Sequence, residues 1–387
     1  MHEIDSIITL IGTDEVKLYK RYTKTFNMKI FAFHLLNDFS GSPKVLMQLL
    51  KGWVAHDLDV TVVTSSGRDG FLTNIPDVKY SFFWYRWAAN PYLRLFNLTL
   101  SQVLLFLKLL FVIRKEDIVY INTVLPFGAA LLGKLKGCRV IYHIHETTMK
   151  PQVYKKFIFG IARVTANDVI YVSDYLARQE EMKGKRIHIL YNAIEDSFLK
   201  KAQTKKNDHR ITKTVLMVCS LKEYKGVHEF VALANLNKRY KFTLVVNATQ
   251  KDINAFFTTA NLPSNLTIYP TQTNLHPIYK SAEIVLNLSR VDGWIETFGL
   301  TIIEGMAYGL PSIVPPIGGI AELIEEDVNG YKIDSRNLSL LSEKIKLLFE
   351  NQGCYEVMSQ RAKEKIKNFK EDVFVKKNLG IIQQKFV

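Results

Sequence analysis

Cysteine is scarce in this sequence, and metal-binding patterns are missing. The 387 residues include three cysteines, Cys138, Cys219 and Cys354, which are odd in number and far apart. Disulfide frameworks use an even number of cysteines, and zinc sites use closely spaced pairs of ligands. Asp57 and Asp59 fit a D-x-D metal-binding pattern, but they precede a predicted strand, at the end opposite the expected site, and are interpreted as a solvated turn. No other carboxylate or histidine cluster has the spacing of a hard-metal site. The sequence therefore predicts a reducing, cytoplasmic location and a reaction that needs neither a metal ion nor another cofactor.

Long hydrophobic runs are missing as well. Glu3 and Asp5 lie where a secretory signal peptide would carry positive charge. The most apolar run, residues 98–113, is shorter than the ~20 residues that span a bilayer, and it contains Lys108. We therefore expect no integral membrane segment. Two interpretations of the run remain: a half-buried helix of the core, or a helix that lies on a membrane surface with basic residues at both ends.

Acidic residues are too few to balance the basic ones. The chain has 51 Lys and Arg against 37 Asp and Glu, which gives a net charge of +14. Such an excess attracts nucleic acid, an anionic membrane or a phosphorylated ligand, but no zinc-ligand pair or RNA-binding aromatic pattern accompanies it. Nucleic acid is therefore not an expected partner. One group of basic residues is either a solvated face or a surface that contacts anionic lipid or a lipid-diphosphate acceptor; its members are Lys134, Lys136, Arg139, Lys150, Lys155 and Lys156.

What the chain does contain is a repeated alternation of short apolar strands and amphipathic helices. Strands are predicted at 29–34, 60–64, 118–122, 139–143, 168–172, 188–191, 215–219, 242–246, 266–269, 284–288 and 312–315. Strands that alternate with helices form parallel sheets through right-handed crossovers, and ligands bind at the carboxyl ends of such strands. The predicted fold class is α/β, with two Rossmann-like domains that face each other across a cleft.

These elements divide the chain into four parts. Residues 1–27 show weak periodicity and are predicted to be an N-terminal extension. The first Rossmann-like domain is expected at 28–200 and the second at 210–370, with a polar, lysine-rich linker at 196–210. Residues 371–387 are expected to form a C-terminal helix that crosses back to the first domain.

The densest group of candidate functional residues lies between Glu296 and Glu304. The sequence from Glu296 reads E-T-F-G-L-T-I-I-E-G-M-A-Y-G-L-P, and a helix is expected to begin at Thr297. Free N–H groups at a helix start form a cradle for a diphosphate; here they would belong to Phe298, Gly299 and Leu300. Eight helical residues rise about 12 Å, so the two carboxylates could bracket the diphosphate and accept hydrogen bonds from a sugar and a ribose. Two glutamates at this spacing also occur on ordinary helices, so the surrounding residues decide.

Those surroundings resemble the E-x7-E signature of the retaining glycosyltransferases of family 4, also called glycosyl transferases group 1, which have the GT-B fold. The resemblance continues in G-G-I-A-E-L-I at 318–324 and N-G-Y at 329–331, and it covers nearly all of 28–387. It implies transfer of a sugar from a nucleoside-diphosphate sugar to an acceptor hydroxyl, with retention at the anomeric carbon. The acceptor is expected to be a lipid-linked or polysaccharide glycan of the cell envelope, reached at the inner face of the membrane.

Two shorter segments resemble the parts of the family that hold the donor diphosphate. The segment S-L-K-E-Y-K-G at 220–226 is similar to the family's R-L-x-x-x-K-G, whose Arg and Lys grip the diphosphate. Lys225 is retained, whereas Ser220 replaces the Arg. In the first strand-to-helix loop, where the family has two glycines, this chain has Gly41 and the small residue Ser42.

Two further segments resemble the family in the first domain. H-I-H-E at 143–146 is similar to an element in which a histidine reaches the donor sugar; His145 is the preferred candidate and His143 the second, although a strand histidine is often a core residue. Y-N-A-I at 191–194 resembles the family's Y-N-G-I at the domain junction and adds Asn192. Ser173, in V-S-D-Y-L, is predicted to be a helix cap.

The resemblance implies a role for each candidate. Glu296 would hold the sugar hydroxyls, His145 the sugar or its developing charge, and Lys225 the departing diphosphate; these three are the predicted catalytic residues. The predicted donor-binding residues are Glu304, Thr297, Phe298, Gly299, Leu300, Gly41, Ser42, Ser220, Asn192 and His143. No carboxylate is placed as a nucleophile, which favours front-face attack with the diphosphate accepting the proton. A GT-B nucleotide-sugar epimerase and a non-catalytic, membrane-associated sugar-nucleotide-binding protein remain as alternatives.

Overall fold

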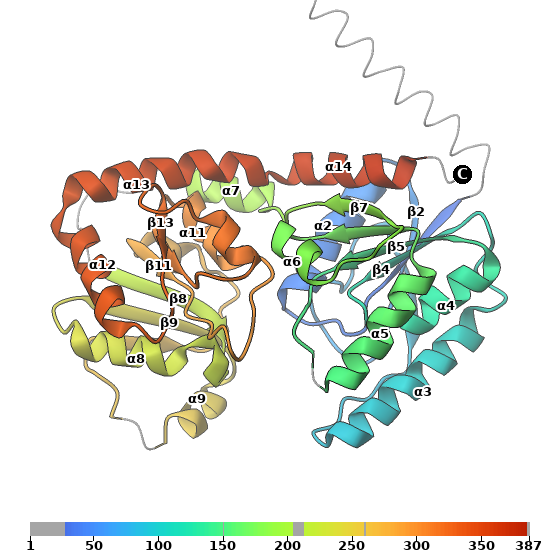
Figure 1. Ribbon diagram of the computed structural model, residues 1–387, viewed down its shortest axis with the longest axis horizontal. Coiled ribbons are helices and arrows are strands. Elements are labelled where there is room, and N and C mark those ends of the chain that lie inside the picture. Colours follow the sequence, from blue (N-terminus) through green and yellow to red (C-terminus); the bar gives the residue numbers. More distant parts are fainter. Residues whose placement is uncertain (1–27, 150, 204–212, 259–260, 385–387) are drawn as a thin grey trace, which may run out of the picture.

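The chain folds into two α/β domains, each built on one parallel sheet (Figure 1). The computed structural model describes residues 28–149, 151–203, 213–258 and 261–384. The predicted extension 1–27, the basic residue Lys150 and the predicted linker from residue 204 on lie outside the described residues. The two sheets confirm the predicted architecture of two Rossmann-like domains.

The first sheet has seven strands in the order β3-β2-β1-β4-β5-β6-β7, and all neighbours are parallel. Its strands are β1 (Lys29–Phe33), β2 (Asp59–Ser65), β3 (Lys79–Phe83), β4 (Ile118–Asn122), β5 (Arg139–Ile144), β6 (Asp168–Tyr171) and β7 (Arg186–Ile189). Its helices are α2 (Gly41–Ala55), α3 (Pro91–Leu109), α4 (Phe127–Lys136), α5 (Gln152–Thr165) and α6 (Asp174–Gln179). Ser173 caps α6, because its hydroxyl accepts from the N–H of Leu176, as predicted.

The second sheet has six parallel strands in the order β10-β9-β8-β11-β12-β13. Its strands are β8 (Thr214–Ser220), β9 (Lys241–Asn247), β10 (Leu266–Tyr269), β11 (Ile284–Leu286), β12 (Ser312–Val314) and β13 (Gly330–Lys332). Its helices are α8 (Val227–Leu236), α9 (Gln250–Phe256), α10 (His276–Lys280), α11 (Leu300–Ala307), α12 (Leu338–Glu350) and α13 (Gln352–Lys365), with 3-10 turns η1 (Glu223–Lys225), η2 (Gly319–Leu323) and η3 (Ile366–Phe369).

Three elements of the structure differ from the prediction. The helix that was expected from Thr297 begins at Leu300. The first part of the predicted linker is a helix, α7 (Asp196–Gln203), which packs against α10 and α11. Strand β3 was not predicted; it is an edge strand whose side chains are mostly half-buried or exposed.

The apolar run at 98–113 lies within α3 and the residues that follow it. The helix buries one stripe at helical spacing, with Leu98, Leu105 and Leu109 directed into the core. Among the described residues, α3 is the helix that is long and apolar enough to cross a membrane by length and composition alone. It packs against α4, and α4 packs against α5, so that the three helices line one side of the first domain (Figure 1).

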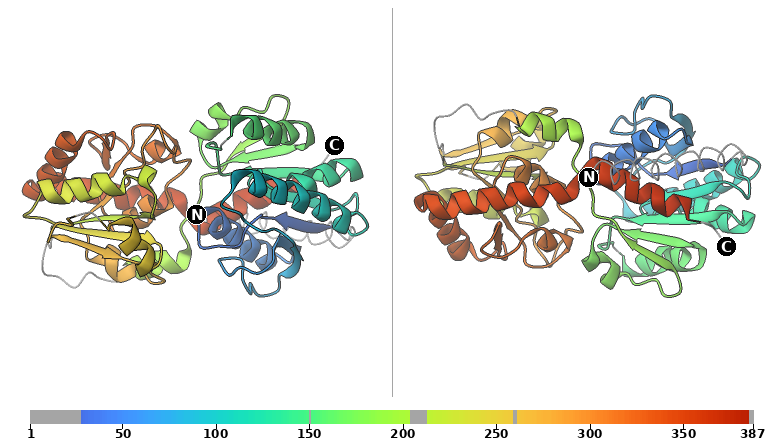
Figure 2. Two further views of the ribbon diagram at one scale, coloured as in Figure 1. Left: turned by 90° about the horizontal axis from the view of Figure 1, so that it is seen from below. Right: turned by 90° about the horizontal axis from the view of Figure 1, so that it is seen from above.

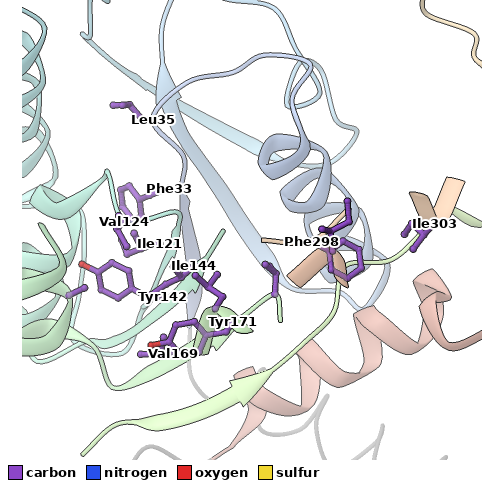
Figure 3. Close-up of a cluster of buried hydrophobic side chains, with 14 of the residues drawn as sticks. Phe33, Leu35, Ile121, Val124, Tyr142, Ile144, Val169, Tyr171, Phe298 and Ile303 are labelled. Carbon is purple, nitrogen blue, oxygen red and sulfur yellow. The ribbon is translucent and has the colours of Figure 1, made fainter. Parts of the chain in front are cut away.

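One hydrophobic core runs from the first domain into the second. Tyr142, Val169 and Tyr171 of the first sheet belong to the same buried cluster as Phe298 and Ile303 of the second domain (Figure 3). A second cluster fills the other face of the first sheet, and a third fills the second domain. The domains are therefore joined by apolar packing, and polar contacts across the cleft add to it.

The C-terminal helices span both domains. Helix α13 lies on the second domain and α14 (Glu371–Gln383) on the first, as the view from above shows (Figure 2). Helix α14 packs against α2, where the indole N–H of Trp53 donates to Asn378 Oδ1 at 2.9 Å. The two helices come so close that a side chain at Gly52 would collide with Val375. The first domain is thus completed by residues from the end of the chain.

Two residues of the predicted basic surface form ion pairs within the first domain instead. Arg139 is 5% exposed, pairs with Asp168 at 2.8 Å and donates to the carbonyls of Ile381 and Ile382 at the end of α14. Lys155 pairs with Glu180. Arg139 is buried there because a guanidinium at the C-terminus of a helix stabilises the last carbonyls and the helix dipole.

Candidate active site

The predicted site residues follow the carboxyl ends of strands in both domains. Gly41 follows β1, His145 follows β5, Lys225 follows β8, and Glu296 and Glu304 follow β11. Two contacts across the domain boundary bring them together: Lys44 Nζ lies 2.7 Å from Glu304 Oε1, and the Thr297 hydroxyl donates to the carbonyl of His145 at 2.6 Å. The carboxyl edges of the two sheets therefore form one composite site.

Glu296 is held as an anion inside this site. Its Oε1 accepts from the ammonium group of Lys225 and from the hydroxyl of Ser289, the latter at 2.6 Å. Burial opposes ionisation, but the charge of Lys225 and hydrogen bonds from Lys225, Ser289 and Asn287 lower the pKa of Glu296 below its usual value. The carboxylate is thus negative at neutral pH and ready to accept hydrogen bonds from hydroxyl groups.

Lys225 is positioned by the glycine that follows it. Gly226 has φ of +75°, and a side chain there would collide with the carbonyl of Leu288. The ammonium group of Lys225 also lies 5.2 Å from the ring centre of Trp294, which stacks on Tyr224. The lysine is therefore fixed between Glu296 and an aromatic pair.

Glu304 is the second carboxylate of the site and is only 5% exposed. Its Oε1 accepts from Lys44 of α2, and its Oε2 accepts from the hydroxyl of Tyr279 at 2.8 Å. The same hydroxyl lies 3.2 Å from the carbonyl oxygen of Thr301, beside the first turn of α11. Sequence patterns did not indicate Lys44 or Tyr279, because both are distant in the chain from the signature.

The start of α11 lies three residues later than predicted, and this changes the expected cradle. Gly299 is the N-cap, and the open N–H groups of the first turn begin at Leu300. Phe298 is 4% exposed and lies between Tyr191 and Phe369, with ring centres 6.1 and 5.9 Å away. The side chains of Thr297 and Phe298 are therefore engaged in joining the domains, and both residues precede the first helical turn.

His145 is a neutral ring with a defined tautomer. The amide nitrogen of Asn122 donates to the carbonyl of Ser42 at 3.0 Å, which directs Asn122 Oδ1 towards His145 Nε2 at 2.9 Å. His145 Nε2 therefore carries the proton and Nδ1 remains an acceptor. Burial, together with His143 and His34, lowers the pKa of His145 well below its usual value. A neutral imidazole can orient a sugar hydroxyl but does not bring a positive charge.

The remaining candidates occupy different environments. His143 is fully buried, its Nδ1 lies 2.9 Å from the Tyr120 hydroxyl, and its position favours the core role. Gly41 lies against the Leu300 side chain, so the starts of α2 and α11 touch. Asn192 is 4% exposed, and its Oδ1 has no hydrogen-bond partner in the described residues. The carbonyl of Ser220 accepts from the N–H of Lys222 and shapes the turn before Lys225.

Acidic and histidine side chains could also act as metal ligands. Within residues 28–384, excluding the gaps named above, no group of three His, Cys, Asp or Glu side chains could hold a metal ion. The acidic groups nearest the predicted chemistry, Glu296 and Glu304, are each paired with a lysine instead.

Comparison with known proteins identifies the family. The model of the Glycosyltransferase Family 4 matches residues 39–198, and that of the Glycosyl transferases group 1 matches residues 199–365, so the two matches together run through both domains. The chain is a family 4 glycosyltransferase. It is therefore an enzyme that transfers a sugar, as the signature at 296–304 predicted.

Relatives of this glycosyltransferase share its length and fold at low sequence identity. N-acetyl-alpha-D-glucosaminyl L-malate synthase from Bacillus anthracis is 23% identical over 350 residues, which cover 84% of this chain and 89% of the relative. Among solved structures, Anabaena HepE in complex with UDP and glucose superposes with a TM-score of 0.75 at 19% identity, over 92% of this chain and all of HepE. S. aureus TarM superposes with a TM-score of 0.71 at 14% identity, over 92% and 99%. These neighbours confirm the GT-B fold.

Proposed function

We propose that this glycosyltransferase moves a sugar from a nucleoside-diphosphate sugar to an acceptor hydroxyl and retains the configuration of the anomeric carbon. One observation carries the proposal: Glu296 and Glu304 flank the open start of α11, and each is ion-paired with a lysine. Carboxylates accept from hydroxyl groups, while lysines and a helix start bind phosphate. The site thus offers contacts of the right sign for a sugar, a diphosphate and a ribose.

The residues present suggest how the reaction proceeds. The bond between the anomeric carbon and the diphosphate oxygen breaks while the acceptor oxygen attacks from the same face, and the departing diphosphate takes the acceptor proton. Lys225 and the N–H groups of Leu300 and Thr301 stabilise the charge that develops on the diphosphate. Glu296 is engaged by Lys225 and Ser289, so it serves as a hydrogen-bond acceptor for the sugar rather than as a nucleophile. No metal ion takes part in this scheme.

UDP-sugars are the first donors to test. The HepE structures contain UDP, UDP with glucose, and UDP-glucose, and HepE shares the fold over its whole length. The proposal for this chain is limited to a nucleoside-diphosphate sugar, and UDP is the nucleotide that the comparison favours.

A thermal-shift panel of UDP-, GDP- and ADP-sugars tests the donor proposal. A ligand at 100 times its Kd stabilises the native state by about 2.7 kcal/mol, so we expect one nucleotide class to raise the Tm by a few degrees. The shift should be lost in Glu304→Ala and kept in Glu343→Ala, a control that changes an exposed glutamate of α12. A panel in which no nucleotide sugar shifts the wild-type Tm contradicts the proposal.

We further propose that the enzyme works at an anionic membrane surface, where a lipid-linked or polysaccharide acceptor is available. The side of the first domain formed by α3, α4 and α5 exposes large apolar side chains, among them Phe96, Leu107, Phe111, Leu135, Phe157 and Val164. Exposed basic residues lie on the same helices and their ends, including Lys108, Arg114, Lys115, Lys134, Lys156 and Arg163. Apolar side chains that enter the lipid boundary, with cations that meet anionic headgroups, are the features of an interfacial surface.

A further inference from the structure

Lys44 brings a positive charge from the first domain to the donor site of the second. It lies in the first turn of α2, and its Nζ is 2.7 Å from Glu304 and 3.8 Å from Glu195. The ammonium group also lies 5.9 and 6.0 Å from the ring centres of Phe71 and Phe198. Burial would lower the pKa of Lys44, but the neighbouring carboxylates, above all Glu304, raise it instead. The side chain is therefore a stable cation enclosed by aromatic rings and carboxylates.

The two signature glutamates are neutralised in the same way, by one lysine from each domain. Glu296 pairs with Lys225 of the second domain, and Glu304 pairs with Lys44 of the first. In the proposed donor complex, Glu304 accepts hydrogen bonds from the ribose. A ribose hydroxyl that approaches Glu304 Oε1 competes with Lys44, because the ammonium group already occupies that oxygen.

The position of Lys44 also places it within reach of the expected diphosphate. Glu304 lies one turn after Leu300, and helical side chains lean back towards the helix start. The carboxylate that holds Lys44 is therefore close to the open N–H groups at the start of α11. Gly41, three residues before Lys44, lies so close to Leu300 that a Cβ there would come within 3.2 Å of the Leu300 side chain.

The end of β8 lacks a cation that could pair with the expected diphosphate. Ser220 stands at the end of β8 where the family pattern has an arginine, and a serine hydroxyl brings no charge. Lys225 would bring one positive charge to a nucleoside diphosphate, which carries more than one negative charge. A second cation close to the start of α11 would supply what is missing, and Lys44 is such a cation.

We propose that Lys44 changes partner when the donor binds: the ribose takes its place on Glu304, and its ammonium group pairs with the diphosphate in place of the absent arginine. The inference rests on the proposed function, because it requires a nucleoside-diphosphate ligand. Since Lys44 belongs to α2, the exchange makes both domains hold the diphosphate, one through Lys44 and the other through Lys225. Donor binding thereby ties α2 to α11.

Binding of UDP and of uridine separates this role from a structural one. We expect Lys44→Met to raise the Kd for UDP about 10- to 100-fold, because a charge-assisted contact to phosphate is lost. The Kd for uridine, measured by ligand-observed NMR, should stay the same or fall, because the ribose no longer competes with the ammonium group for Glu304. Lys44→Arg should recover most of the UDP affinity. Lys51→Met, on an exposed position of the same helix, is the matched control and should change neither Kd.

Three results would overturn the proposal. Lys44→Met could leave UDP binding unchanged, or it could weaken UDP and uridine by the same factor, which would mean that Lys44 only positions Glu304. If Lys44→Met does not fold, the double variant Lys44→Met/Glu304→Gln removes both charges of the pair and is compared with Glu304→Gln alone. An equal ratio of the uridine Kd to the UDP Kd in these two variants would also mean that Lys44 only positions Glu304. If the wild-type chain binds none of UDP, GDP and ADP, the proposed function itself fails. Binding of UDP that is insensitive to Lys44 defeats only the present inference.

Discussion

The smallest feature on which the proposed donor site depends is the backbone of Gly226. Its φ of +75° is unfavourable for any residue with a side chain, and a Cβ there would also meet the carbonyl of Leu288. We expect Gly226→Ala to lower the free energy of unfolding by more than the ~1 kcal/mol that a strained φ costs alone, and to weaken donor binding through Lys225.

Gly184→Ala is the matched control for that prediction. Gly184 has nearly the same φ, +72°, but a Cβ there would meet nothing within 4 Å. The difference in Tm between the two variants therefore isolates the collision at Gly226. Equal Tm values, with unchanged donor binding in both, would show that the turn before α8 does not position Lys225.

Buried histidines make the first domain sensitive to acid. Burial lowers the pKa of His34 to about 4 and that of His143 to about 3, whereas an unfolded histidine titrates near 6.5. Between these values the unfolded chain binds more protons, so the stability present at neutral pH is lost as pH falls below about 6.5. Glu146, whose pKa burial raises to about 7, acts in the opposite direction and offsets part of the loss.

His143→Phe tests this pH dependence. Each buried histidine contributes a slope of up to ~1.4 kcal/mol per pH unit, and the variant removes one of them while Glu146 is unchanged. We expect the urea midpoint of the variant to fall less than that of the wild type between pH 7 and pH 5. Parallel decreases in the two proteins would mean that His143 is not neutral in the fold.

At the residue scale, the sequence indicates local groups and not distant pairs. Lys225, Glu296 and Glu304 were predicted as site residues because each lies in a short segment with a recognisable pattern. Lys44 and Glu304 are 260 residues apart, so no local pattern indicates that they pair. His143 and His145 differ in their burial and in their hydrogen-bond partners. The sequence H-I-H does not reveal either difference.

Among the elements, α14 shows how a helix near the end of the chain stabilises the first domain. Arg139 and Asp168 form a buried pair, and Arg139 also donates to the last carbonyls of α14. Burial opposes ionisation of Asp168, but hydrogen bonds from His188, Arg139 and Arg186 lower its pKa far below the usual value. Removing Arg139 would therefore leave a buried charge partly unpaired and the helix end uncapped.

We expect Arg139→Met to lower the free energy of unfolding by about 3–5 kcal/mol, as for other buried ion pairs that lose one partner. Limited proteolysis should then cut within α14, because the helix end loses its anchor. Lys134→Met changes an exposed lysine of α4 and should have little effect on either measurement. Resistance of Arg139→Met to proteolysis equal to that of the wild type would contradict this account of α14.

Element boundaries were predicted best where burial alone decides them. The central strands β1 and β4 are buried along most of their length and were found within a residue of their ends. The start of α11 was missed because Thr297 and Phe298 make contacts with the other domain instead of helical ones. Helix α7 was taken for a linker because it has no fully buried residue.

At the scale of the molecule, the apolar face of α3, α4 and α5 predicts binding to anionic vesicles. The wild-type protein should float with vesicles that contain an anionic lipid, bind purely zwitterionic vesicles more weakly, and dissociate as salt screens the basic residues. Phe111→Glu, at a position 91% exposed, should weaken flotation without loss of fold. Val357→Glu, at an exposed apolar position of α13 in the second domain, is the control. Equal flotation of the two variants would argue against this surface.

The whole architecture followed from the sequence more readily than the way the domains meet. Repeated strands and helices indicate two parallel sheets, since each unit can be recognised by itself. The shared core at Phe298 and Tyr171, and the pairing of Lys44 with Glu304, depend on the relative position of two separately folded sheets. That position is set by contacts between distant residues, which only the structure shows.

The most direct test of the central claim follows the sugar itself. An α-linked donor such as UDP-glucose is incubated with the enzyme, and proton NMR records the first anomer released by slow hydrolysis, with water as the acceptor. The proposed chemistry predicts that α-glucose appears first, and that Glu296→Gln suppresses its release. Initial release of β-glucose would contradict retention. Conversion of the donor to another nucleotide sugar, or no reaction with any UDP-, GDP- or ADP-sugar even when membrane lipid is added, would contradict sugar transfer.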